Sequence, residues 1–126
     1  MKRSSLSAGL FIPALLDKAG VEAPVYPAVV PMEATLPYIV YARKAYTGTQ
    51  AKGSGPSDSV TVSVWCSHSG YEESVELAES VREAVEGKTA VMDDGLRLRC
   101  ARLEDSTETY SDDAYTQYLE FTLQIN

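Results

Sequence analysis

The chain has 126 residues, of which 44% are hydrophobic and 23% are charged, and its formal net charge is −7 at pH 7. This length and composition predict one globular domain, 1–126, that buries roughly two-thirds of its unfolded surface. The acidic balance argues against specific nucleic-acid binding, which needs clustered Lys and Arg, and no apolar run approaches the ~18 residues that a membrane-spanning helix requires.

The first predicted element is an amphipathic helix over residues 5–18. We interpret it as part of the folded domain and not as a signal peptide, because Pro13 interrupts the apolar stretch and no convincing cleavage site follows. Pro13 also lies too deep for the first turn of a helix that starts at Ser5, so we expect a kink or a start near Phe11. Gly20 is placed to end the helix.

Prolines dominate the stretch that follows, at positions 24, 27, 31 and 37. Because proline cannot donate a hydrogen bond within a sheet, residues 25–30 are expected to form an edge strand or an extended arm. Residues 37–46 are rich in β-branched and aromatic side chains and predict a strand. Residues 47–58 contain several glycines and small polar residues and predict a long flexible loop.

The next block predicts a strand that leads into an amphipathic helix. Val60, Val62, Val64 and Cys66 alternate with smaller polar residues and with Trp65, as in a half-buried strand. A turn over residues 67–70 follows. One side of the predicted helix carries the apolar residues Tyr71, Val75, Ala78, Val81 and Val85, and Gly87 closes the segment.

The C-terminal third predicts two further strands. A turn at Asp93-Asp94-Gly95 precedes a strand over 96–100, and the inward parity then slips near Ala101 or Arg102, which indicates a bulge. Residues 104–113 are acidic and rich in hydroxyl groups and predict a loop or hairpin tip. The last strand, 115–125, alternates most regularly.

This order of elements predicts an α+β fold in a single domain, with a mainly antiparallel sheet of four to five strands and two helices packed on it. Cys66 and Cys100 both fall on the apolar-facing parity of their strands. They form either a buried reduced pair or, if the strands are neighbours, a disulfide. Two cysteines do not make a disulfide scaffold, which favours a reducing cytoplasm.

The residues that could carry chemistry all have a simpler structural interpretation. His68, the sole histidine, stands beside Ser67 and Ser69 in a turn, and sequence adjacency does not make a catalytic pair. Asp93-Asp94-Gly95 lacks the alternating oxygen ligands of a calcium loop. Cys66, His68 and Cys100 lack zinc-site spacing. We therefore predict no catalytic, cofactor-binding or metal-binding residues and no enzymatic activity.

A protein interface is the better prediction. Trp65 faces away from its valine neighbours, so either the first helix covers it or it is an exposed aromatic of the kind that anchors interfaces. The eight tyrosines support the second reading, because they cannot all fill one small core. The candidate interface residues are Trp65, Tyr41, Arg43 and Tyr118.

The order of the predicted elements and motifs also resembles that of a known protein family. The residues that carry the likeness are Leu36-Pro37-Tyr38-Ile39-Val40-Tyr41 after a proline-rich arm, Val60-Thr61-Val62-Ser63-Val64-Trp65, Tyr71-Glu72-Glu73-Ser74 leading to Leu77-Ala78 and Val81-Arg82, an acidic loop, and a final tyrosine-bearing strand. The chain resembles, over nearly its whole length, the tail-completion or tail-terminator proteins of long-tailed bacteriophages and prophages.

The resemblance implies a structural protein that forms a ring, usually a hexamer, at the head-proximal end of the tail tube. There it stops polymerisation of the tube and offers a surface to the head connector. It implies assembly in the bacterial cytoplasm and a place in the virion tail or neck. Two alternatives stay open: another neck or tail component, such as a head–tail joining protein or a tube subunit, and an unrelated small ligand-binding α+β domain.

Overall fold

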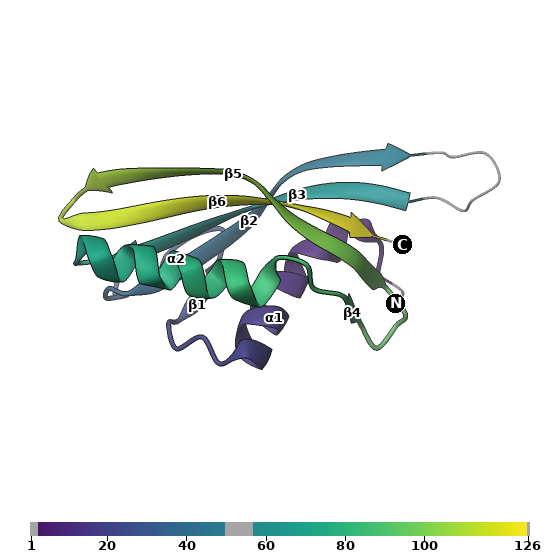
Figure 1. The fold of residues 1–126 in the computed structure, drawn as a ribbon. Helices are drawn as coiled ribbons and strands as arrows, with labels where there is room; N and C mark the ends of the chain where they lie inside the picture. The colour runs from purple at the N-terminus through teal and green to yellow at the C-terminus, as the bar shows by residue number, and fades with distance from the viewer. Residues whose placement is uncertain (1–2, 50–56, 126) are drawn as a thin grey trace.

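The computed structural model describes residues 3–49 and 57–125. Within these ranges a six-stranded sheet carries both α-helices on the same face (Figure 1). The elements in chain order are η1 (Ser5–Leu10), α1 (Phe11–Ala19), β1 (Val25–Pro27), β2 (Tyr38–Thr49), β3 (Ser57–His68), α2 (Tyr71–Val85), β4 (Ala90–Val91), β5 (Arg97–Ser111) and β6 (Ala114–Ile125).

The strand order across the sheet is β1-β2-β3-β6-β5-β4. The β1–β2 pair is parallel, and the other neighbouring pairs are antiparallel. The α+β class with helices packed on a sheet is confirmed. The prediction of four to five strands is wrong, because the short strands β1 and β4 complete a six-stranded mixed sheet at its two edges.

The first helix is divided in two. A 3₁₀ helix, η1, ends at Leu10, and the α-helix α1 begins at Phe11. Pro13 therefore lies in the first turn of α1, where its missing N–H breaks no intrahelical hydrogen bond. Gly20 ends α1 with φ of 76°, in the left-handed region that glycine adopts without strain. The start near Phe11 and the stop at Gly20 are both confirmed.

The hydrophobic core lies between the helices and the sheet face that they cover. The four inward residues of β3, Val60, Val62, Val64 and Cys66, are fully buried there together with side chains of α1, α2, β5 and β6. On α2 the predicted apolar stripe holds at its C-terminal end but not at its start, because Tyr71 is 49% exposed. The buried position in the first turns is Ser74, whose hydroxyl donates to the carbonyl of Tyr71 at 2.6 Å.

The predicted loop over 47–58 is largely strand in the part that the structure describes. The β2–β3 ladder continues through the pairs Gly48↔Asp58 and Thr49↔Ser57. Residues 50–56 of that prediction lie outside the described residues. Polar sequence alone predicted a loop, whereas antiparallel pairing gives these polar residues partners in the ladder.

The bulge expected near Ala101 or Arg102 is replaced by two irregularities on either side of that position. The β5–β6 register shifts between Leu98 and Cys100 and again between Leu103 and Asp105. The first shift turns Ala101 inward and Cys100 outward, so the prediction that Cys100 faces the core is wrong. Since β6 separates β3 from β5, Cys66 and Cys100 do not lie on neighbouring strands, and both are free thiols.

The acidic segment 104–113 is mostly strand and not a loop. Strand β5 continues to Ser111, and the hairpin to β6 closes with two residues, Asp112 and Asp113, between the paired Ser111 and Ala114. Both aspartates have positive φ, 53° and 61°, as a two-residue type I′ turn requires. The hairpin-tip alternative is thus correct only for these two residues.

None of the helices in the described ranges has the length and hydropathy needed to cross a lipid bilayer. The sheet presents two different surfaces, one packed against helices and one that no helix in the described ranges covers (Figure 1).

Candidate functional site

The uncovered face of the sheet carries a row of large side chains that crosses four strands. The register places Tyr26 of β1 opposite Val40 of β2, Val40 opposite Trp65 of β3, and Trp65 opposite Tyr118 of β6. Residues directly opposite in a ladder share a face. Three of these four residues are aromatic, and we call Tyr26, Val40, Trp65 and Tyr118 together the aromatic row.

The rings in this region contact one another. The ring centroids of Trp65 and Tyr118 lie 5.5 Å apart with an interplanar angle of 50°. Tyr26 also meets Tyr38 edge to face at 6.5 Å. Such pairs contribute about 0.5–1.5 kcal/mol beyond the area that they bury. Trp65 and Tyr118 are only half-buried, so part of each ring stays exposed on this face.

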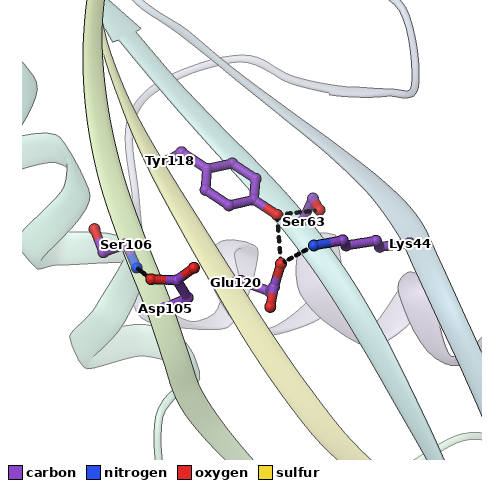
Figure 2. Close-up of polar contacts among 6 residues, drawn as sticks. All are labelled: Lys44, Ser63, Asp105, Ser106, Tyr118 and Glu120. Atoms are coloured by element: carbon purple, nitrogen blue, oxygen red, sulfur yellow. Dashed lines mark hydrogen bonds and ion pairs between the residues drawn. The ribbon is translucent and has the colours of Figure 1, made fainter.

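A polar network adjoins the aromatic row (Figure 2). The Tyr118 hydroxyl donates to Glu120 Oε1 at 2.8 Å, so it accepts the hydrogen bond that joins it to Ser63 Oγ at 2.7 Å. Lys44 Nζ donates to the same Glu120 oxygen at 2.6 Å. Glu120 thus joins β2 to β6, and Ser63 connects β3 to this network through the Tyr118 hydroxyl.

A backbone irregularity brings Lys44 to this face. The β2–β3 register shifts between Arg43 and Ala45, which leaves Lys44 as the extra residue of a bulge. Its side chain then reaches across β3 to β6 and points at Glu120 (Figure 2). No simple alternation in the sequence signals this orientation.

The network shifts the titration of its members. The hydrogen bond from Lys44, followed by that from Tyr118, lowers the pKa of Glu120. The hydrogen bond and charge of Glu120 raise the pKa of Lys44. Burial raises the pKa of the Tyr118 hydroxyl, and its hydrogen bond to Glu120 acts in the same direction. Each shift favours the form that the group already has near pH 7, which is charged for Lys44 and Glu120 and neutral for Tyr118.

The structure brings together two of the four residues that the sequence selected. Trp65 and Tyr118 are adjacent, whereas Tyr41 and Arg43 lie on the helix side. The Tyr41 ring is partly buried against the core. Arg43 Nη1 donates to the carbonyl of Leu6 in η1 at 2.9 Å. Sequence reasoning missed Lys44, whose bulge has no signal, and Glu120, which does share the parity of Tyr118 in β6.

His68 is the last residue of β3 and pairs with Tyr115, so placing it in the turn was wrong. Its Nδ1 accepts a long hydrogen bond of 3.4 Å from the N–H of Gly70. It lines an open hollow of about 710 Å³ between α1 and α2, together with Glu73 and Glu76. Within residues 3–49 and 57–125, no three or more His, Cys, Asp and Glu side chains are grouped to hold a metal ion.

Comparison with known proteins gives a consistent assignment. A family model described as "Tail completion protein gp17" matches residues 12–125. A chain of the virion of a native gene transfer agent particle has the same fold, with a TM-score of 0.68 at 20% identity, over 96% of this chain and 88% of that chain. A second solved structure matches with a TM-score of 0.66 at 14% identity, over 97% and 94% of the two chains. No curated protein is significantly similar in sequence.

Proposed function

Because this chain belongs to the tail completion protein gp17 family, and so to the structural proteins of phage tails, we propose that it caps the head-proximal end of the tail tube as a ring. In that position it ends polymerisation of the tube and joins it to the head. The family match over residues 12–125 carries this proposal. We assign the protein no catalytic role.

The physical character of the chain supports this role. A ring closed by rotation needs a heterologous interface made of two different surfaces, and a sheet with two different edges supplies them. The net charge of −7 suits a ring through which DNA passes without being held, because polyanions are repelled. Assembly in the bacterial cytoplasm and incorporation into the virion tail or neck follow from the same proposal.

We assign the uncovered sheet face to contacts with other components, the tail tube or the head connector. Trp65 and Tyr118 lie there as half-exposed aromatic neighbours, and aromatic side chains dominate the energetics of protein interfaces. Tyr41 and Arg43, on the helix side, belong to a separate surface beside η1.

Complementation of tail assembly tests the proposal. In a phage or prophage that lacks this gene, the parent chain is expected to restore tails of uniform length, and Trp65→Ala is expected to reduce the yield of capped tails. Ser80→Ala, on the exposed side of α2, is the matched control. Light scattering and negative-stain images of the purified chain are expected to show a closed ring.

The same measurements separate the alternatives. A tube subunit would polymerise into long tubes instead of stopping at one ring. A head–tail joining protein would leave tail length unchanged when it is absent and would block only attachment of heads. An unrelated ligand-binding domain would leave tails unaffected in every respect.

A further inference from the structure

The two edge strands of the sheet are covered over only part of their length. Strand β1 pairs with residues 39–41 of β2, and β4 pairs with residues 97–98 of β5. In the part of the chain that the structure describes, no strand pairs with the outer side of β2 beyond these residues or with the outer side of β5 beyond its start.

The next stretch of β5 is occupied by the end of α2. The N–H of Gly87 donates to the carbonyl of Ala101 at 2.8 Å, and the N–H of Leu103 donates to Glu86 Oε2 at 3.1 Å. The open part of this strand is therefore 105–111, the β5 free edge. The corresponding part of β2 is 42–49, the β2 free edge.

One backbone donor on the β5 free edge is capped from within the strand. The N–H of Ser106 donates to Oδ1 of its neighbour Asp105 at 2.9 Å (Figure 2). Native proteins protect the edges of sheets with charged side chains because an unpaired edge is a template for another strand. The cap marks Ser106 as a donor that faces outward and has no strand partner within the described chain.

The two free edges carry opposite charge. The charged residues of the β2 free edge are Arg43 and Lys44. The β5 free edge contains Asp105 and Glu108 and no basic residue. Three further carboxylates flank it, those of Glu104, Asp112 and Asp113. Opposite charges across neighbouring strands stabilise pairing, whereas like charges oppose it.

We propose that the β5 free edge of one protomer pairs with the β2 free edge of a second copy of this chain, so that one sheet continues from protomer to protomer around the ring. This inference rests on the proposed function, since it identifies the interface that closes the proposed ring. Pairing of β5 with β5 of another copy is disfavoured, because the acidic residues of both copies would then lie along the same junction.

The geometry of the sheet suits this junction. The three pairs from β2 through β3 and β6 to β5 are antiparallel, so β2 and β5 run in opposite directions. Rotation about the ring axis leaves corresponding strands of neighbouring protomers pointing the same way along that axis. The β5 of one protomer therefore lies antiparallel to the β2 of the next.

The two free edges lie at opposite ends of the sheet along the strands. Through the register, Tyr46 is level with Leu123 and Glu108 with Gln117 of β6. The centres of the two free edges are therefore about 20 Å apart in the direction of the strands. Across the strands, the four spacings from β2 of one protomer to β2 of the next span about 19 Å. The junction thus requires strands tilted by about 45°, close to the tilt of closed β-barrels.

Disulfide trapping tests the junction. In a Cys100→Ser background, Thr47→Cys is combined in turn with Asp105→Cys, Thr107→Cys or Thr109→Cys, which share the uncovered face and sample registers two residues apart. Light scattering records the oligomer before mild oxidation. We expect a ladder of covalent oligomers from one of the three pairs and none from Thr47→Cys with Asp93→Cys, in the turn before β5.

The outcomes distinguish this inference from the proposed function. An oligomer that gives no ladder with any of the three pairs overturns the edge junction and leaves the ring standing. A chain that stays monomeric at all concentrations overturns the ring, and the junction with it. A ladder from the control pair as well shows random collision and also counts against the junction.

A proline substitution provides the second test. Ser106→Pro removes the outward N–H, whereas Ser106→Ala keeps it. Loss of hydrogen bonds at one edge position is expected to weaken association about tenfold in Ser106→Pro, with Ser106→Ala close to the parent. Circular dichroism checks that both variants fold. Equal association of two folded variants contradicts the proposal.

Discussion

The carboxylate of Glu86 accepts a hydrogen bond from the backbone N–H of Leu103 at 3.1 Å, and its other oxygen pairs with Arg82 at 2.8 Å. One side chain thus joins the C-terminal turn of α2 to the edge of β5. The hydrogen bond from Arg82, followed by that from the Leu103 N–H, lowers the pKa of Glu86.

Replacing Glu86 is expected to destabilise the fold. Glu86→Ala leaves the N–H of Leu103 without its acceptor, and loss of such a bond costs about 1 kcal/mol. Urea denaturation measures the change in the free energy of unfolding. Glu83→Ala, an exposed glutamate of the same helix, is the matched control, and an equal effect of both substitutions would contradict a specific role for Glu86.

The Lys44–Glu120 pair predicts how stability depends on pH. Glu120 has a lowered pKa in the folded chain, so on acidification the unfolded chain takes up this proton first. Its contribution is present above the ordinary glutamate pKa of 4.5 and is lost as the pH falls through the lower folded value. Lys44 has a raised pKa, so its contribution is lost as the pH rises beyond 10.5.

Glu120→Gln tests that dependence. Urea midpoints measured from pH 7 to pH 3 are expected to fall less steeply in Glu120→Gln than in the parent, because the group that titrates is gone. Glu72→Gln, in the exposed first turn of α2, is the control. Equal pH dependence of the urea midpoints in Glu120→Gln and the parent would show that the Lys44–Glu120 pair contributes nothing to the loss of stability at acidic pH.

Val64→Asp tests the register of the core. Val64 is 0% exposed in the middle of β3, and an aspartate there places an unpaired charge among apolar side chains. The expected loss is several kcal/mol, on the order of the whole stability of a marginal domain. Thermal denaturation followed by circular dichroism measures it, with Thr107→Asp on exposed β5 as the control. A soluble and cooperatively folded Val64→Asp chain would refute the register.

His68→Ala is expected to leave folding and assembly nearly unchanged. Among the described residues the imidazole has only two hydrogen-bond contacts, of 3.4 and 3.5 Å, and both are longer than usual hydrogen bonds. The thermal midpoint and the oligomeric state of the variant provide the check. A hydrolytic activity that the parent has and His68→Ala lacks would overturn the assignment of a purely structural protein.

The acidic hairpin is expected to act on association and not on folding. Asp112→Asn together with Asp113→Asn keeps residues that tolerate positive φ, so stability is expected to change by less than about 0.5 kcal/mol. Removing two charges is expected to flatten the dependence of self-association on salt concentration, as measured by analytical ultracentrifugation. Glu79→Gln with Glu83→Gln on α2 is the control, and equal salt dependence in both double variants would assign the effect to net charge alone.

The sequence predicted elements well where one face of the element is buried. Strand β6 alternates strictly because Leu119, Phe121 and Leu123 pack under the helices while their neighbours face outward. The outer half of β5 was missed because residues 105–111 are polar on both faces. Its extended conformation depends on pairing with β6, a long-range contact that leaves no local period.

The candidate site was predicted only in part, for a similar reason. Parity along β3 placed Trp65 on the face opposite the valines, and parity along β6 placed Tyr118 outward. Their contact depends on the register between β3 and β6, and the position of Lys44 depends on a bulge. Neither the register nor the bulge can be predicted from the spacing of residues within one strand, so only the structure showed the network around Glu120.

The sheet has a packed face and an uncovered face, and substitutions on the two faces have different consequences. Substitutions at Val62 or Phe121 act on folding, because both side chains are fully buried beneath the helices. Substitutions at Thr61 or Thr122 alter the outer surface and leave the core intact. Substitutions on the outer surface can therefore accumulate at little cost in foldability, so the fold can persist after most of the sequence has changed.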